Sequence, residues 1–371
     1  MTETKTFHDA YTLNNGVAIK NRLVVAPMTH WASVPEDGSL TDVERAFLQD
    51  RAKGFGLFIS AATLVSEEGR AFLGEPFAVG VQDLPSLKER ADLIKAQGAK
   101  VILQIHHGGW NLLAPPAEGL TAIAPSANAE HHAVEATKEE IHRLIEAYAN
   151  ATALAIEAGY DGVEVHGANN YLLQQFYSAE SNHREDDWGG TREKRMRFPL
   201  AVLDACLAVK EKAGKDEFIM GYRFSPEEPG DNGLTMEDTF ALLDALMERP
   251  LQYLHVSLHD YYAKARRGAD ETRDRMELLH EHINGRLPLI GVGNLLTGEA
   301  VEAAFAAGDA EFIALGKAVL VNPLMGELLT EGRYDEIETE IDPERKEEYC
   351  YPEALWNLNM MKMEFLPKVK E

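Results

Sequence analysis

The chain has 371 residues, of which 45% are hydrophobic and 8% aromatic, proportions typical of a folded globular protein. Its formal net charge of −25 at pH 7 disfavours roles on nucleic acid or on anionic membranes, because both carry phosphate charges of the same sign. Only two cysteines are present, Cys206 and Cys350, and neither belongs to a C-x-x-C pair, which disfavours disulfide, zinc and iron–sulfur frameworks.

The N-terminal stretch Met1–Asp9 is polar and mixed in charge, unlike a signal peptide. No later apolar run approaches the roughly 20 residues that span a bilayer. We therefore expect a cytoplasmic protein, and one that holds any anionic ligand through a local cluster of donors rather than through its overall field.

Eight short runs rich in Val, Ile, Leu and Phe recur along the chain, each followed by a segment with the period of an amphipathic helix. Strict alternation of strand and helix predicts a parallel sheet. The predicted strands are Arg22–Met28, Leu57–Leu64, Val101–His107, Gly162–His166, Phe218–Phe224, Tyr253–Leu258, Leu287–Val292 and Phe312–Leu315.

Capping patterns mark the starts of several predicted helices, where a threonine is followed three residues later by an acidic residue. The clearest helix runs from Thr137 to Ala158, with its apolar residues on one stripe and Gly159 as the expected C-cap. The three capping pairs are Thr41 with Glu44, Thr137 with Glu140, and Thr235 with Asp238.

Eight strand–helix units favour closure into a single (β/α)8 TIM barrel, an α/β fold. The competing open, doubly wound sheet usually carries a glycine-rich turn after its first strand, whereas Ala26-Pro27-Met28-Thr29 follows here. We expect the barrel to span residues 1–332. A C-terminal extension, 333–371, contains an aromatic and Met-rich tail that we expect to pack on the barrel or on the partner subunit of a homo-oligomer.

Polar residues and glycines gather at the carboxyl ends of the predicted strands, where barrels of this kind build their active sites. Any one of them has an ordinary structural explanation, but all eight strand ends agree. These residues are Pro27, Met28 and Thr29; Ala62; Gln104, His106 and His107; His166, Asn169 and Tyr171; Arg223; His255 and Ser257; Gly293 and Asn294; and Gly316 with Lys317.

The fourth strand end carries the most chemistry. His166 and Asn169 can both donate hydrogen bonds to one oxygen and stabilise charge that develops there, and Tyr171 is a phenol able to supply a proton. A zinc site that uses His106, His107 and His166 is the alternative, but no Asp or Glu follows at ligand spacing.

The last two strands end in glycine. Gly293 and Gly316 would let backbone N–H groups approach an anion closely, and Lys317 adds one positive charge. Barrels commonly bind phosphate at this place, so these residues predict a phosphate site.

With these residues assembled, the chain resembles the old yellow enzymes, also called NADH:flavin oxidoreductases, from about Asn21 to Pro323. Three motifs carry the resemblance together with the Arg223-Phe224-Ser225 strand end and the Gly291-Val292-Gly293-Asn294 stretch. They are Asn21-Arg22-Leu23-Val24-Val25-Ala26-Pro27-Met28-Thr29, the spaced group of His166, Asn169 and Tyr171, and the run from Ser181 to Gly190.

The resemblance implies FMN bound without a covalent bond across the barrel mouth and NADH or NADPH as electron donor. It assigns His166 and Asn169 to the substrate oxygen, Tyr171 to proton donation, and Trp31 and His106 to the substrate pocket. The FMN-binding set that it implies is Pro27, Met28, Thr29, Ala62, Gln104, Arg223, Gly293, Asn294, Gly316 and Lys317.

Two positions depart from the family pattern. Lys317 stands where the family usually has Arg, so that a two-pronged phosphate contact becomes a point charge. His106 occupies a strand position where family members vary, and an imidazole there is expected to narrow or polarise the pocket.

The function that the resemblance implies is ping-pong transfer of hydride to an activated alkene or a related small electrophile. Reduction of a quinone, a nitro compound or oxygen is a second hypothesis on the same fold. From other classes, a zinc-dependent barrel hydrolase and a non-catalytic flavin-binding or phosphate-binding module remain as alternatives. No metal, nucleic acid or membrane is expected as a partner.

Overall fold

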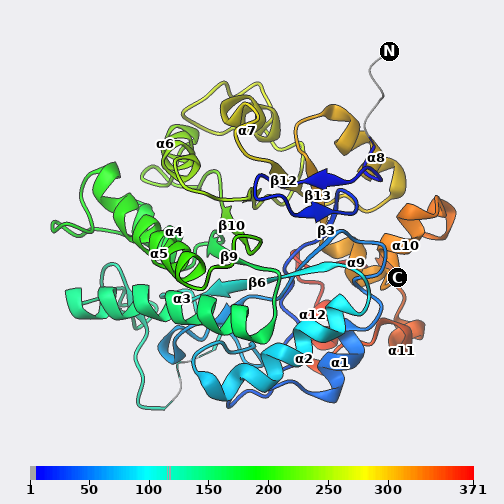
Figure 1. The fold of residues 1–371 in the computed structure, drawn as a ribbon, viewed down its shortest axis with the longest axis horizontal. Coiled ribbons are helices and arrows are strands. Elements are labelled where there is room, and N and C mark those ends of the chain that lie inside the picture. Colours follow the sequence, from blue (N-terminus) through cyan, green and yellow to red (C-terminus); the bar gives the residue numbers. More distant parts are fainter. Residues whose placement is uncertain (1–5, 115, 117) are drawn as a thin grey trace.

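The computed structural model describes residues 6–114, 116 and 118–371. Within that part of the chain, eight parallel strands form a closed barrel surrounded by helices, as Figure 1 shows. The barrel strands are β3 (Leu23–Val25), β4 (Leu57–Ile59), β6 (Lys100–His106), β9 (Gly162–Gly167), β10 (Ile219–Phe224), β11 (Tyr253–Val256), β12 (Leu289–Val292) and β13 (Phe312–Leu315).

The barrel closes between its first and last strands. Leu315 of β13 lies opposite Val25 of β3, and β4 pairs with both β3 and β6. Every other barrel strand pairs with its predecessor in parallel. An open sheet would leave β3 or β13 unpaired on one side, so the predicted TIM barrel is confirmed.

The helices pack around the outside of the barrel, because each crossover between parallel strands returns the chain along the outer face (Figure 1). The helices of the described residues are α1 (Asp42–Leu48), α2 (Leu84–Lys95), α3 (Lys138–Ala158), α4 (Leu172–Tyr177), α5 (Arg192–Lys212), α6 (Met236–Met247), α7 (Arg275–Ile283), α8 (Gly298–Ala307), α9 (Lys317–Val321) and α10 (Met325–Thr330), followed in the C-terminal lobe by α11 (Lys346–Tyr349) and α12 (Glu353–Met360). Short 3-10 helices cover Glu67–Gly69, Val81–Asp83, Tyr334–Glu336 and Pro343–Arg345.

The predicted helix caps form as the sequence indicates. Thr137 caps α3, Glu140 bonds back to it, and Gly159 ends the helix in the left-handed conformation at φ 84°. The same reciprocal box forms at the start of α6. At α1, Thr41 caps the helix, but the side chain of Glu44 turns instead toward a buried arginine, described below.

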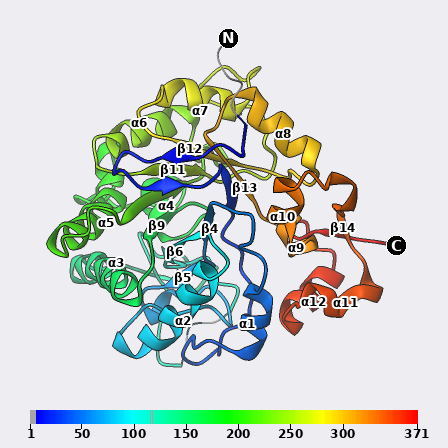
Figure 2. The same cartoon turned by 45° about the vertical axis from the view of Figure 1, so that its right-hand side comes forward.

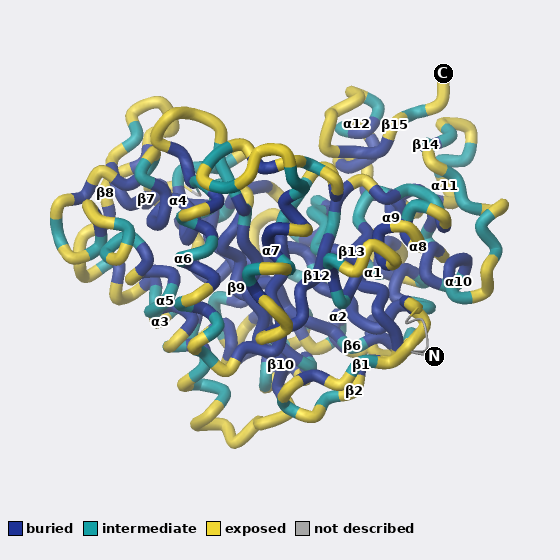
Figure 3. The backbone as a smooth tube through the Cα atoms, turned by 90° about the horizontal axis from the view of Figure 1, so that it is seen from above, coloured by how far each residue is buried: buried dark blue, intermediate teal, exposed yellow. Residues whose placement is uncertain are grey.

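Two layers of core follow from the alternation of side chains along the strands. Residues such as Val24, Ile102 and Ile290 fill the barrel interior, and Leu13 and Ile19 of the hairpin β1 (Tyr11–Thr12) and β2 (Ala18–Ile19) close its amino end. A larger apolar layer lies between strands and helices. Figure 3 shows this buried interior under exposed loops.

The second predicted strand, Leu57–Leu64, is divided. The chain pairs as β4, leaves the ladder over residues 60–62, and pairs again as β5 (Thr63–Leu64) against β6. The Ser60 hydroxyl accepts a hydrogen bond from the Gln104 backbone N–H, and the Thr63 hydroxyl donates to the Ala61 carbonyl. Apart from the Ser60 N–H, which still donates to the Ile102 carbonyl, side chains take the place of strand pairing at this point.

Residues 333–371 form a lobe beside α9 and α10 that contains α11, α12 and the pair β14 (Glu340–Ile341) and β15 (Lys368–Val369) (Figure 2). The buried guanidinium of Arg51 donates to the Tyr349 carbonyl, and Leu355 and Trp356 join the outer core of the barrel. The boundary between a barrel of residues 1–332 and an extension remains a prediction.

Two further small elements, β7 (Ile123–Ala124) and β8 (Val134–Glu135), pair in the long loop between β6 and α3. Among the described residues, we find no helix with both the length and the apolar character needed to cross a membrane.

Candidate active site

The carboxyl ends of the barrel strands open into a cavity of about 1150 Å³. Ligand pockets usually enclose roughly 300–1000 Å³, so there is room for a cofactor together with a small molecule. The predicted site residues that line this cavity are Pro27, Met28, Thr29, Trp31, Asn169, Tyr171, Arg223, Gly293, Asn294, Gly316 and Lys317.

The other four predicted residues, Ala62, Gln104, His106 and His166, are buried and do not belong to the described lining of the cavity. Gln104 directs its amide N–H to the carboxylate of Glu164 at 2.7 Å. The Nε2 atom of His106 lies 2.5 Å from the carboxylate of Glu75. The polar ends of these two side chains thus meet buried acids.

The turn after β9 brings together the three predicted catalytic residues. Asn169 and Asn170 both have positive φ, 58° and 59°, a conformation that Asn adopts more readily than most residues. The ring centroids of His166 and Tyr171 lie 5.3 Å apart. The amide oxygen of Asn169 accepts a 2.7 Å hydrogen bond from Ser257, which leaves the amide nitrogen as the donor for a ligand.

Burial sets the protonation of two of these groups. It lowers the pKa of His166 well below its ordinary value, and Arg223, His106 and His255 act in the same direction. Burial and the negative charge of Glu75 raise the pKa of Tyr171 to about 12, although Arg223 opposes them. The site therefore presents a neutral imidazole and a phenol that keeps its proton.

A buried polar layer supports the centre of the cavity. Glu164 accepts hydrogen bonds from Gln104 and, at 2.9 Å, from His255. Burial alone would raise the pKa of Glu164, but His255 and Arg223 outweigh it and the pKa lies below its ordinary value. Arg223 has one 3.2 Å contact, to Ser257, and its Nε atom has no partner among the described residues. A positive charge therefore faces the cavity with donor capacity to spare.

Gly293 and Gly316 both line the cavity, but the fold itself requires glycine at only one of these two positions. Gly293 has φ 149°, and a Cβ there would lie 2.3 Å from the Tyr261 backbone nitrogen, so the fold itself requires glycine. At Gly316 a Cβ would meet nothing closer than 3.7 Å. Because no contact within the chain requires glycine there, this position is suited to close approach by a ligand.

Lys317 follows directly and donates to the Glu364 carbonyl at 2.8 Å, and the neighbouring Phe365 and Leu366 line the cavity. The C-terminal extension thus contributes to the wall beside the predicted phosphate site.

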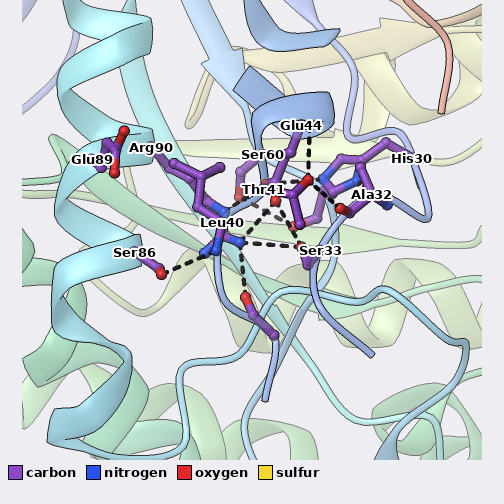
Figure 4. A network of polar contacts seen from close by, with 12 residues as sticks. His30, Ala32, Ser33, Leu40, Thr41, Glu44, Ser60, Ser86, Glu89 and Arg90 are labelled. Carbon is purple, nitrogen blue, oxygen red and sulfur yellow. Dashed lines mark hydrogen bonds and ion pairs between the residues drawn. The ribbon is translucent and has the colours of Figure 1, made fainter. Parts of the chain in front are cut away.

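The loop that carries Thr29 and Trp31 is held from behind by a buried charge cluster, shown in Figure 4. Arg90 of α2 donates to the carboxylate of Glu44 at 2.6 Å and 2.9 Å, and His30 lies 3.4 Å from the same carboxylate. The Nδ1 atom of His30 accepts from the Ala32 backbone N–H. These contacts flank Trp31, whose φ of 54° is unusual for a bulky residue and is maintained by the surrounding structure.

No site role was predicted from the sequence for Glu75, Glu164, Phe365 or the Trp110–His131 pair. The two glutamates lie inside the structure and show no motif, although an acidic residue within a run as apolar as Gly162–His166 is a usable signal. Trp110 and His131, with ring centroids 4.5 Å apart, line the cavity from the long β6–α3 loop. Only the folding of that loop over the mouth places them there.

The zinc hypothesis finds no support in the arrangement of side chains. The rings of His106 and His166 lie 6.0 Å apart, and His107 faces Glu68 instead. Over the ranges that the structure describes, no three His, Cys, Asp or Glu side chains are grouped to hold a metal ion.

The residues at the mouth fit FMN. The unpartnered guanidinium edge of Arg223 suits the electron-rich edge of a flavin, and the open backbone at Gly316 beside Lys317 suits its phosphate. Fold and site together define a flavin-dependent barrel oxidoreductase.

The comparisons with known proteins agree. The chain belongs to the NADH:flavin oxidoreductase / NADH oxidase family, whose model matches residues 11–336. The protein is therefore an oxidoreductase of a family that uses FMN and a reduced nicotinamide, and its resemblance to the old yellow enzymes is confirmed.

Three proteins illustrate the similarity. The probable NADH-dependent flavin oxidoreductase YqiG of Bacillus subtilis is 44% identical over 355 residues, with 95% of each chain covered. The NADH:fumarate oxidoreductase of Klebsiella pneumoniae is 36% identical over 97% of this chain, which spans only 40% of that protein. The solved structure of morphinone reductase superposes with a TM-score of 0.74 at 26% identity, covering 89% of this chain and 90% of that one; the same reductase is also known in complex with tetrahydroNAD.

Proposed function

We propose that the protein takes hydride from a reduced nicotinamide and delivers it to an activated alkene, in two half-reactions that use the same cavity in turn. The observation that carries this proposal is that Asn169, Tyr171 and Arg223 line one cavity, while the ring of His166 lies just behind the wall, 5.3 Å from the ring of Tyr171. An oxygen-bearing acceptor would find two hydrogen-bond donors and a proton donor within one turn of chain.

FMN, when bound, supplies the ring that accepts and releases the hydride. Pro27, Met28, Thr29 and Ala62 would hold one edge of the ring, and Gln104 would act from the layer beneath it. Arg223 would place positive charge beside the ring and so favour its reduced, anionic form. Gly293, Asn294, Gly316 and Lys317 would hold the phosphate.

The acceptor would lie against Trp31, with His166 and Asn169 donating to its oxygen. Since His166 is neutral, it donates from one ring nitrogen only, and the Ser257 hydrogen bond orients the Asn169 amide for the second contact. Tyr171 would give its proton to the carbon next to the activating group as hydride reaches the other carbon. His106 would influence the acceptor from behind the wall. The names of the fumarate and morphinone reductases are consistent with acceptors of this class.

An anaerobic titration of the FMN-loaded protein tests the proposal. NADH or NADPH should bleach the flavin, and a cyclic enone should restore its colour. Failure of both nicotinamides to bleach the flavin would favour a binding module. If the nicotinamide bleaches the flavin but only a quinone, a nitro compound or oxygen restores its colour, the result would favour the second hypothesis, reduction of one of those acceptors. Colourless protein with stoichiometric zinc would indicate the hydrolase.

Lys317 offers a separate test of the phosphate site. Replacing it with Met removes one charge-assisted hydrogen bond of roughly 1.5–3 kcal/mol, so the Kd for FMN should rise roughly 10- to 100-fold. Lys317→Arg should bind FMN at least as tightly as the parent because a guanidinium can hold phosphate with two parallel bonds. Flavin fluorescence during titration of the apoprotein measures both, and unchanged affinity in Lys317→Met would contradict the assignment.

A further inference from the structure

Glu75 is a buried acid that the proposed reaction does not use. Its side chain is 0% exposed, and it lies in the chain between β5 and α2. One carboxylate oxygen accepts the Ala71 backbone N–H at 2.9 Å, and the other lies 2.5 Å from Nε2 of His106. Burying a carboxylate is unfavourable unless its charge has a function or a partner.

His106 separates this acid from the proton donor. Its ring is fully buried and meets the ring of Tyr171 edge-on, with centroids 4.7 Å apart. Neither ring nitrogen has an aligned hydrogen-bond partner among the described residues. The order in space is therefore Glu75, His106, Tyr171, and the last of these lines the cavity.

A positive charge also acts on Tyr171. Arg223 is paired in register with His166 on the adjacent strand, is buried, and favours loss of the Tyr171 proton. The ionisable groups that face Tyr171 are thus Glu75, His106 from β6, His166 from β9 and Arg223 from β10. Tyr148 of α3 also feels the charge of Glu75.

We infer that Glu75 is a positioning residue for Tyr171: it holds a carboxylate 2.5 Å from the His106 ring that packs against the phenol, and its charge offsets that of Arg223, so that a proton donor and a guanidinium can share one site. This role rests on the proposed function of Tyr171. It explains why an imidazole at position 106, although outside the cavity wall, has a buried carboxylate behind it.

Two substitutions of Glu75 test the effect of its charge separately from the effect of its side-chain shape. Glu75→Gln keeps an oxygen for the Ala71 N–H but removes the negative charge, so Tyr171 should ionise about one pH unit lower. The alkaline limb of the pH profile for flavin reoxidation by an enone should move down by the same amount. Flavin reduction by the nicotinamide should not change, and Glu75→Asp, which keeps the charge, should restore most of the parental profile.

Ionisation of Tyr171 can be read without turnover. In FMN-loaded protein labelled with 3-fluorotyrosine, the fluorine resonance that disappears in Tyr171→Phe identifies this residue, and its chemical shift follows the phenol through a pH titration. Glu68→Gln is the matched control, because Glu68 faces the neighbouring His107 and does not line the cavity. It should leave the Tyr171 titration in place.

Two results would overturn the inference. The first is that both the Tyr171 titration and the alkaline limb of the pH profile stay in place in Glu75→Gln. The second is that Tyr171 of the parent protein ionises below the ordinary pH range of a phenol, a result that can be obtained even if the variant does not fold. A Tyr171 resonance that shifts as expected in a protein that reduces no enone would support the role of Glu75 and contradict the proposed function.

Discussion

Replacing Tyr171 with Phe is expected to slow reoxidation of the reduced flavin by an enone by about 10²- to 10⁴-fold, the range that a positioned general acid contributes. The phenol lines the cavity and keeps its proton, because burial and Glu75 raise its pKa to about 12. The ring and its packing survive in Phe, so the loss should come from the missing proton rather than from a changed pocket.

The two half-reactions, measured separately, distinguish proton donation by Tyr171 from a general disturbance of the active site. Anaerobic stopped-flow measurements should show that nicotinamide still reduces the flavin of Tyr171→Phe at the parental rate, and that a quinone or oxygen still reoxidises it. Tyr160→Phe is the control, since it removes a buried hydroxyl that has no partner in the described chain and that lies away from the active site, at a second, small cavity lined by His30 and Glu44. An equal loss with enone and quinone would contradict proton donation by Tyr171.

Replacing Arg90 with Met is expected to cost roughly 3–5 kcal/mol of stability, because it leaves the buried Glu44 carboxylate without its main partner. Burial alone would raise the pKa of Glu44, but His30 and Arg90 outweigh it and the pKa lies below its ordinary value. A carboxyl with a depressed folded-state pKa stabilises the fold above its unfolded pKa, and this contribution is lost as the pH falls through the folded pKa.

The pH dependence of this loss of stability follows from the same Glu44–Arg90 pair. Without Arg90, Glu44 should take up its proton at a higher pH, so the difference in stability from the parent should be largest at neutral pH and shrink in acid. Thermal unfolding of the parent and of Arg90→Met, at neutral pH and in acid, measures this difference in stability. Arg273→Met removes ion pairs to Glu277 and Glu281 on the surface and should have little effect. Similar losses in both variants would contradict a special role for the buried pair.

This second prediction also concerns function, because the Glu44–Arg90 cluster holds the loop on which Thr29 and Trp31 reach the cavity. At temperatures where Arg90→Met is folded, we expect a higher KM for the acceptor, since Trp31 is held at a positive φ by its surroundings rather than by its own preference. The double variant Glu44→Leu/Arg90→Met should recover part of the stability, because it removes the unpaired charge as well.

The order of strands and helices was readable because it depends on local patterns. The run Phe312–Leu315 is apolar on both faces, as a strand buried on both sides must be. The cap of α3 at Thr137 and its end at Gly159 depend only on residues within one turn of the helix. Closure of the sheet then brings every strand end to one mouth, which is why the eleven lining residues were found together.

The orientation of the polar side chains depended on contacts between distant segments. Gln104 and His106 lie on the inward face of β6, but whether each reaches a ligand or a buried acid depends on Glu164, which is 60 residues away from Gln104, and on Glu75, which comes from a loop. No spacing in the sequence relates Glu75 to Tyr171. The same holds for Phe365 and Leu366, which reach the cavity only because the extension folds back to meet Lys317.

The sequence by itself therefore determined the barrel, the family and the set of strand-end residues proposed for the site, because strand period, helix caps and strand-end motifs are properties of neighbouring residues. The tertiary structure alone decided which of those residues line the cavity and which lie behind it. The physical reason is that burial and the nearness of Glu75, Glu164 and Arg223 set the charge and hydrogen bonding of each group, and these are produced by packing between segments that share no local pattern.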